Sequence, residues 1–221
     1  MKAKISEIFK SIQGEGIYIG KEQIFVRFYG CNLNCSFCDT KLYHFKEMGL
    51  KEVKKVIDSY KKISSVSITG GEPLLQKDFL HSFFILLKKE QKEVYLETNG
   101  TLPSALEKVI DSVDIISMDI KLPSSTKERE YFNEHRAFLE TASQKNVFVK
   151  TVVTPYTTID DFIKALKLVK SINENIPFVI QPSYQHQFIL KNKLMDFYIN
   201  AKEYLKDVRI IPQMHKILGV K

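Results

Sequence analysis

The stretch Gly30-Cys-Asn-Leu-Asn-Cys-Ser-Phe-Cys-Asp-Thr40 holds all three cysteines of this 221-residue chain, Cys31, Cys35 and Cys38. Thiols gathered in one C-x3-C-x2-C loop are expected to bind a metal centre. Three thiolates can hold three irons of a four-iron, four-sulfide (4Fe-4S) cluster and leave the fourth iron open. Electron-carrier clusters usually close every position with cysteine, so an open iron indicates chemistry at the metal.

Two other uses of the cysteines have to be weighed. His44 follows Cys38 by six residues, so the spacing also permits a Cys3His zinc site. A disulfide is the least favoured reading, because three thiols cannot all pair and the start of the chain lacks an apolar signal core. Spacing alone leaves the cluster and the zinc site open.

Apolar runs alternate with segments whose apolar residues recur at helical spacing, such as 159–169. This alternation predicts an α/β fold with a parallel sheet. The runs expected as strands are 24–29, 65–69, 94–97, 114–118, 147–153, 177–181 and 208–211. In such sheets ligands gather at the carboxyl ends of the strands. The residues that follow those ends, and that we expect to share one site, are Cys31, Gly70, Gly71, Glu72, Thr98, Asn99, Asp119, Lys121, Gln181, Ser183, Gln213 and His215.

Arg27 interrupts the apolar run 24–29. A charge in a central strand is costly unless it is paired. Arg27 is therefore expected either to pair with an internal acid or to point at a ligand. The run Ser11-Ile-Gln-Gly-Glu-Gly16 is read either as a surface turn or as a loop whose polar groups contact a ligand.

Composition places limits on the function. The length fits one domain over residues 1–221, and 44% hydrophobic residues are ordinary for a globular protein. The net charge of +7 is spread over helical segments with interleaved acids, which indicates solvated helix faces and no nucleic-acid partner. No run is long enough to span a membrane. The free thiols favour the reducing cytoplasm.

The order of the cysteine loop, Thr69-Gly-Gly-Glu-Pro73 and Glu97-Thr-Asn-Gly100 resembles the radical S-adenosylmethionine (radical SAM) superfamily. Phe9-Lys-Ser-Ile-Gln-Gly-Glu-Gly16, Phe25-Val-Arg-Phe-Tyr-Gly-Cys31, Cys38-Asp-Thr40 and Pro212-Gln-Met-His-Lys216 are similar to the 7-carboxy-7-deazaguanine synthase family, over nearly the whole chain. The match is loosest at Met118-Asp-Ile-Lys121. The resemblance implies a partial (β/α)6 barrel with an extra N-terminal strand and a C-terminal strand.

The same resemblance implies the activity and the site. It implies a lyase of queuosine biosynthesis that converts 6-carboxy-5,6,7,8-tetrahydropterin to 7-carboxy-7-deazaguanine and ammonia. Its cofactors would be a 4Fe-4S cluster on Cys31, Cys35 and Cys38, S-adenosylmethionine, and magnesium on Thr40. Residues implied for S-adenosylmethionine are Phe37, Cys38, Asp39, Gly71, Glu72, Asp119, Lys121, Gln181 and Ser183. Those implied for the carboxypterin are Ile12, Gln13, Gly14, Glu15, Arg27, Thr69, Gln213 and His215.

The family likeness also implies an electron donor such as flavodoxin or ferredoxin, and a homodimer. Two alternatives are kept at this stage. A glycyl-radical activating enzyme shares the cysteine spacing but would act on a protein. A non-catalytic iron–sulfur or zinc module would explain the cysteines but not Gly70-Gly-Glu-Pro73.

Overall fold

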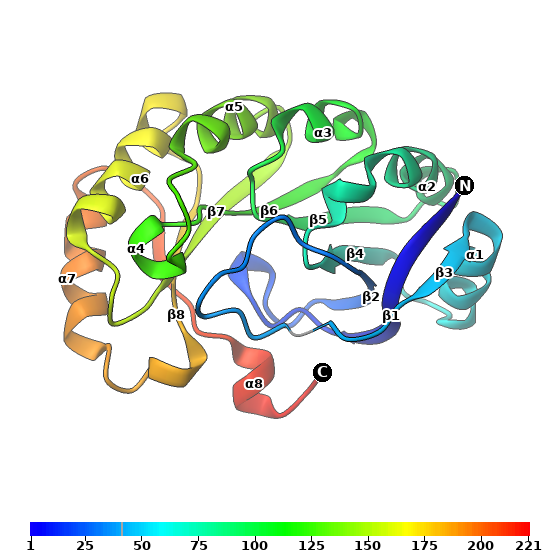
Figure 1. The fold of residues 1–221 in the computed structure, drawn as a ribbon, viewed down its shortest axis with the longest axis horizontal. Helices are drawn as coiled ribbons and strands as arrows, with labels where there is room; N and C mark the ends of the chain where they lie inside the picture. Colours follow the sequence, from blue (N-terminus) through cyan, green and yellow to red (C-terminus); the bar gives the residue numbers. More distant parts are fainter. Residues whose placement is uncertain (41) are drawn as a thin grey trace.

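The computed structural model describes residues 1–40 and 42–221, and within them one curved sheet forms the frame of the protein (Figure 1). Its strands are β1 (Lys2–Ile12), β2 (Glu22–Phe28), β3 (Lys46–Gly49), β4 (Ser65–Gly70), β5 (Glu93–Thr98), β6 (Ile115–Asp119), β7 (Asn146–Val153), β8 (Phe178–Pro182) and β9 (Val208–Ile210). They lie in the order β3-β1-β2-β4-β5-β6-β7-β8-β9.

The strands from β2 onward, apart from β3, run parallel, while β1 is antiparallel to β2 and β3 is antiparallel to β1. A helix connects each parallel strand to the next. The helices are α1 (Leu50–Ser59), α2 (Lys77–Lys89), α3 (Pro103–Glu107), α4 (Pro123–Thr126), α5 (Phe132–Ala142), α6 (Ile159–Ile172), α7 (Lys191–Lys202) and α8 (Met214–Leu218). This arrangement confirms the expected α/β fold, an open partial barrel with an added strand at either end.

The main core fills the layer between the sheet and the helices on its outer side, where α2, α3, α5, α6 and α7 follow the curve of the sheet (Figure 1). β4 and β6 are almost wholly buried. β6 is apolar over most of its length, whereas β4 alternates apolar residues with Ser65, Ser67 and Thr69, whose hydroxyls are hydrogen-bonded on the inner face of the sheet.

A smaller apolar cluster lies on the inner face of the sheet, where Tyr95 and Phe148 pack with Ile17 and Tyr18. The 3-10 helix η1 (Gly16–Tyr18) carries these last two residues. Gly16 has φ +67°, and a Cβ at that position would lie 2.4 Å from the Phe148 ring. The chain therefore turns tightly against the sheet here and closes one end of the barrel interior.

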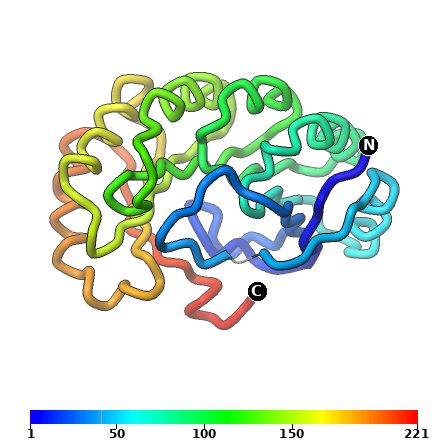
Figure 2. The backbone as a smooth tube through the Cα atoms, in the orientation of Figure 1, coloured from blue at the N-terminus to red at the C-terminus, as the bar shows by residue number. Residues whose placement is uncertain are grey.

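The C-terminal segment packs near this closure, against the loop that follows β1. Figure 2 shows the red C-terminal segment passing beneath the blue N-terminal loop, and the Met214 amide donates to the Gly14 carbonyl at 2.9 Å. In the described part of the chain, no helix has the length and apolar character needed to cross a membrane.

Each of the seven apolar runs expected as strands lies on a strand, with ends shifted by one or two residues. Two strands were absent from those runs. β3 is a short polar strand at the edge of the sheet, so it has no apolar signal. β1 contains a register shift between Ile5 and Glu7, which breaks the alternation that would mark a strand.

Candidate active site

A cavity of about 1050 Å³ opens at the carboxyl ends of the parallel strands. It is large enough for a nucleoside cofactor together with a bicyclic substrate. The predicted site residues that line it are Ile12, Gln13, Gly14, Glu15, Arg27, Cys31, Cys35, Phe37, Cys38, Asp39, Thr40, Thr69, Gly71, Asp119, Lys121, Gln181, Ser183, Gln213 and His215. Glu72 is the predicted site residue that the structure does not place on the cavity wall.

Gly70 and Gly71 set the position of the cysteine loop (residues 30–40). A Cβ on Gly70 would lie 2.1 Å from the Phe28 carbonyl oxygen, and one on Gly71 would lie 2.2 Å from that of Gly30. The Glu72 amide donates to the Gly30 carbonyl at 2.8 Å. Both glycines line the cavity, and their closest contacts are with the backbone that leads to Cys31.

The far side of the cysteine loop is fixed by the segment that contains α4. The Ser36 amide and hydroxyl donate to the carbonyls of Thr126 and Ser125, each at 2.9 Å. The Asn34 amide donates to Glu128 at 2.6 Å. These contacts leave the three cysteines facing one cavity.

The chemistry of the three thiols fits a cluster better than a single ion. Within residues 1–40 and 42–221, no three His, Cys, Asp or Glu side chains converge closely enough to hold one metal ion. In a four-iron cluster each thiolate binds a different iron, which permits a wider spacing. Burial raises the pKa of Cys31, and that of Cys35 to about 11. Both thiols must lose a proton when metal binds.

Glu72 lies behind the cavity wall and holds the residues that form it. Its buried carboxylate accepts hydrogen bonds from the amides of Leu74 at 3.0 Å and Asn99 at 2.8 Å, and from the Thr98 hydroxyl at 2.9 Å. The Asn99 side chain in turn donates to Asn32 at 2.9 Å and lies 3.9 Å from the Cys31 sulfur. The side chain of Glu72, predicted as a cofactor contact, therefore positions Asn99 instead.

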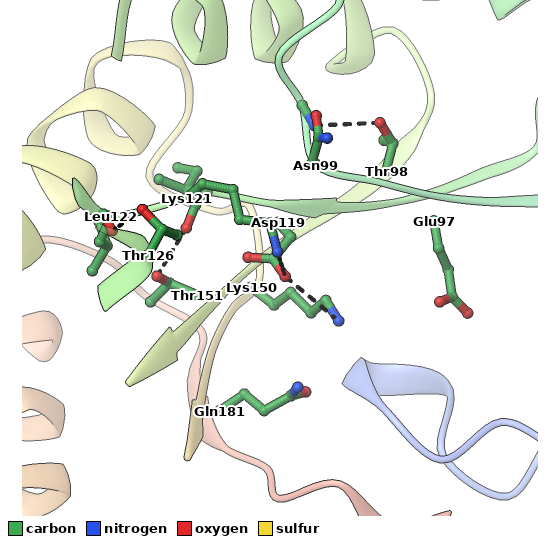
Figure 3. Close-up of polar contacts among 12 residues, drawn as sticks. Glu97, Thr98, Asn99, Asp119, Lys121, Leu122, Thr126, Lys150, Thr151 and Gln181 are labelled. Carbon is green, nitrogen blue, oxygen red and sulfur yellow. Dashed lines mark hydrogen bonds and ion pairs between the residues drawn. The ribbon is translucent and has the colours of Figure 1, made fainter. Parts of the chain in front are cut away.

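Asp119 and Lys121, where the sequence match was loosest, form an ion pair at 2.8 Å in which Asp119 is buried and Lys121 is partly buried (Figure 3). Despite burial, Asp119 and Cys35 raise the pKa of Lys121. The second oxygen of Asp119, Oδ1, and the side-chain oxygen of Gln181 are buried without a hydrogen-bond partner in the part of the chain described. These unpaired acceptors suit a ligand rich in hydroxyl, amino or ammonium donors, which is the character of S-adenosylmethionine.

Glu15 lies at the centre of the most concentrated charge in the cavity. Its carboxylate is ion-paired with Lys150 on β7 and accepts from the amides of Gln213 at 2.7 Å and Gln181 at 3.2 Å. Burial alone would raise the pKa of Glu15, but Lys150, Gln213 and His215 hold it well below its usual range. His215 packs against Gly14, because a Cβ on Gly14 would lie 2.5 Å from the His215 ring.

Sequence reasoning missed Lys150 and Glu97. Lys150 interrupts the apolar run 147–153 as Arg27 interrupts 24–29, so the same signal was present. Glu97 stands in a motif that was quoted, but no role was assigned to it. It accepts from Gln13 at 2.8 Å and from Thr69 at 3.1 Å, and so joins two predicted substrate residues.

Arg27 is both paired and turned toward the cavity. Its Nε donates to Glu7 at 2.8 Å, and its guanidinium lies 5.6 Å from the centre of the Phe9 ring. Among the described residues neither terminal nitrogen has a hydrogen-bond partner, so the Nη1/Nη2 end remains available to a ligand. The two expectations for this charge, an acid partner and a ligand-facing position, are thus compatible.

Asp39 and Thr40 lie at the C-terminal side of the cavity. Asp39 accepts from Gln213 at 3.1 Å and is ion-paired with Lys216. Burial alone would raise its pKa, but Lys216 and Gln213 lower it. The Thr40 hydroxyl is exposed and lies 3.3 Å from Asp39. Asp39 therefore contacts the segment that follows β9, on the side of Glu15.

Comparison with known proteins gives a consistent result. Residues 25–169 match the radical SAM superfamily. The chain is 37% identical, over 98% of its length and 97% of the relative, to a 7-carboxy-7-deazaguanine synthase of Geobacter sulfurreducens. It is 36% identical, over 100% of its length and 99% of the relative, to one of Methanothermobacter thermautotrophicus.

Two solved structures share the fold. The crystal structure of QueE from Escherichia coli superposes with a TM-score of 0.68 at 20% identity, covering 97% of this chain and 95% of that one. Archaeal TYW1 gives a TM-score of 0.54 at 16% identity, covering 83% of this chain and 72% of that one.

The buried carboxyl of Glu72 should make the stability of the protein depend on pH. Burial raises its pKa from 4.5 to about 7. A raised folded-state pKa means that stability is fully present below pH 4.5 and is lost as the pH rises through 7. Between pH 5.5 and 8 we expect wild type to lose about 2 kcal/mol of unfolding free energy relative to Glu72→Gln. Urea unfolding of wild type and Glu72→Gln at several pH values measures this difference. If the unfolding free energies of the two proteins changed in parallel with pH, the prediction would be wrong.

Proposed function

The chain belongs to the 7-carboxy-7-deazaguanine synthase family of the radical SAM superfamily, and we propose that it converts 6-carboxy-5,6,7,8-tetrahydropterin to 7-carboxy-7-deazaguanine with loss of ammonia, as a lyase of queuosine biosynthesis. One observation supports this most strongly. A single cavity has three thiols in one part of its wall, and an arginine fork and the partly buried carboxylate of Glu15 elsewhere in the same wall. The curated relatives do not favour glycyl-radical activation.

Residues near the cysteine loop would hold the cofactors. Cys31, Cys35 and Cys38 would bind three irons of the 4Fe-4S cluster and leave the fourth for S-adenosylmethionine. Around that cofactor would lie Phe37, Asp39, Gly71, Asp119, Lys121, Gln181 and Ser183. When bound, the cluster and S-adenosylmethionine supply the electron and the radical chemistry of the reaction. The protein would position both molecules.

Asp119 and Gln181 support this assignment because each offers a buried, unpaired acceptor oxygen. Lys121 fixes Asp119 through their ion pair and lies 5.5 Å from the centre of the Phe37 ring. The Lys121 ammonium therefore contacts both Asp119 and the face of the Phe37 ring. A ligand with several hydroxyl and amino donors would satisfy the two oxygens.

Arg27 would bind the substrate carboxylate. Its Nε is engaged by Glu7, so the two terminal nitrogens can form parallel hydrogen bonds with a planar anion. Gln13, Glu15, Thr69, Gln213 and His215 would contact the heterocycle, with Ile12 and Gly14 packing beside it. Their mixture of donors and acceptors suits a ring with amide, amino and ring N–H groups.

Thr40 would ligate magnesium. The ion commonly takes few protein oxygens and completes its shell with substrate and water. Placed between Thr40 and the substrate, it would orient substrate oxygens and offset carboxylate charge. The exposed position of the Thr40 hydroxyl on the cavity wall leaves room for such a shell. A small reductant such as flavodoxin or ferredoxin, cytoplasmic location and a homodimer remain predictions.

The direct test of the function is anaerobic reconstitution with iron and sulfide, then incubation with reductant, S-adenosylmethionine, magnesium and the carboxypterin. We expect about four irons per chain and a deazapurine product by mass spectrometry. Replacing Cys31, Cys35 or Cys38 with alanine should abolish cofactor cleavage. A colourless protein that holds one tightly bound zinc and forms no product would refute the proposal.

For Arg27→Ala, product formation should fall roughly a hundredfold at limiting substrate, because one partner of a desolvated charge pair is lost. The cluster spectrum and uncoupled cofactor cleavage should persist. Arg209→Ala is the matched control, since Arg209 on β9 is half exposed and bonds Asp207 through both Nε and Nη2 at 2.8 Å. Loss of the iron–sulfur spectrum in Arg27→Ala would show that Arg27 is structural.

Thr40→Val keeps the shape of the side chain and removes its hydroxyl. If the hydroxyl ligates magnesium, turnover should lose most of its stimulation by the ion, while S-adenosylmethionine affinity stays near wild type. Thr40→Ser should retain the stimulation. A magnesium titration of the three proteins decides the matter, and superimposable activation curves would exclude Thr40 as a ligand.

A further inference from the structure

Lys150 lies in the middle of β7 and is 9% exposed, in a strand whose other residues are apolar except Asn146 and Thr151. A buried ammonium is costly unless its charge is met. Its Nζ is ion-paired with Glu15 and lies 3.8 Å from Asp119 Oδ2 (Figure 3). Burial lowers the pKa of Lys150, but Glu15, Asp119 and Glu97 outweigh it and leave the pKa raised. Lys150 is therefore a permanent cation between two acids.

Glu15 has a limited number of acceptor positions. An ionised carboxylate offers about four lone-pair sites. In the described chain three protein donors use them, since Gln213 contacts Oε1 while Gln181 and Lys150 contact Oε2. About one position, on Oε1, is left for a ligand N–H. If Glu15 were protonated, the added hydrogen would occupy an acceptor position on one carboxyl oxygen. The position on Oε1 that is left for a ligand N–H would then be lost.

We propose that Lys150 is a positioning residue that keeps Glu15 ionised and oriented, so that Glu15 accepts a hydrogen bond from a ring N–H or amino group of the substrate. This inference rests on the proposed function, and it assigns Lys150 a part in choosing the substrate. A heterocycle with an acceptor at that position would meet a fixed negative charge and be rejected.

Other charges around Glu15 cannot replace Lys150. The hydrogen bond from Gln213 and the charge of His215, on α8, also favour the ionised form, but they act against the full cost of burial. Asp39 on the cysteine loop and Tyr95 on β5 also face Glu15, and an anion at either would oppose its ionisation. Asp119 and Glu97 act through Lys150 and add negative charge. Without Lys150, burial and these acids would raise the pKa of Glu15.

The test compares Lys150→Met, which keeps the length without the charge, with Lys150→Arg. Dissociation constants of the carboxypterin are measured by calorimetry on cluster-loaded protein with S-adenosylmethionine, at pH 6.5 and 8.5. For Lys150→Met we expect binding roughly thirtyfold weaker than wild type at pH 6.5. The ratio of the Lys150→Met dissociation constant to that of wild type should be smaller at pH 8.5, because Glu15 of the variant ionises at the higher pH. Lys150→Arg should retain most of the affinity.

A merely structural role would weaken binding by the same ratio at both pH values, and that result would overturn the proposal. The double variant Glu15→Gln/Lys150→Met removes both charges, which is often tolerated even when breaking a buried pair is not. If Lys150 acts through Glu15, this double variant and Glu15→Gln should bind the carboxypterin alike. Further loss in the double variant would show that Lys150 acts elsewhere.

Failure of the proposed function would have a different signature. Wild type would then bind no carboxypterin at any pH, and the state of Glu15 would be read from thermal stability instead. In Lys150→Met, Glu15 has a raised folded-state pKa, so the melting temperature should fall as pH rises from 5.5 to 8.5. Wild type and the Glu15→Gln/Lys150→Met protein should show only the smaller fall that Glu72 causes in all three proteins, so the signature of Glu15 is the additional fall in Lys150→Met. Parallel curves for Lys150→Met and the double variant would refute the role of Lys150.

Discussion

Buried charge is the constraint on which the site depends. Lys150 and Glu15 are held inside the barrel, where an unpaired charge of either sign would strongly destabilise the fold. Their pairing fixes the loop that carries Glu15 against β7, while Asp119 and Lys121 form a second pair beside them. The same contacts leave particular atoms unsatisfied, namely Asp119 Oδ1 and the Gln181 oxygen, within the part of the chain described. The charges that hold the inner wall together therefore also determine which ligand groups the wall can accept.

The cysteine loop depends on close backbone packing more than on charge. Gly70 and Gly71 bring the end of β4 within contact of Phe28 and Gly30, and no larger residue fits there without displacing backbone. Glu72 then holds Asn99 beside Cys31, and Ser36 anchors the opposite side of the loop on the segment with α4. A cluster with one open iron needs its three ligands on a rigid support, and this packing of backbone and hydrogen-bonded side chains supplies it.

The sequence predicted the parallel strands well, because apolar residues recur in short runs along them, and most of the residues expected at their carboxyl ends line one cavity. β3 was missed since an edge strand of four mostly polar residues has no apolar pattern, and the bulge in β1 hides its alternation. Glu72 was placed on the cavity because its motif adjoins the site, but the turn after β4 points its carboxylate inward. Lys150 was overlooked although it breaks an apolar strand as Arg27 does. The partners of such charges come from distant segments, as Glu15 and Lys150 do, and no local pattern reveals them.

The central claim is that one cavity holds the cofactor by the cysteine loop and the substrate between Arg27 and Glu15. The most direct measurement is an anaerobic crystal structure of the reconstituted protein with S-adenosylmethionine and the carboxypterin, with iron located by its anomalous scattering. The account predicts iron at Cys31, Cys35 and Cys38, the substrate carboxylate on the terminal nitrogens of Arg27, and a ring or amino N–H donating to Glu15. A cluster elsewhere, or a carboxypterin bound without contact to Arg27 and Glu15, would contradict it.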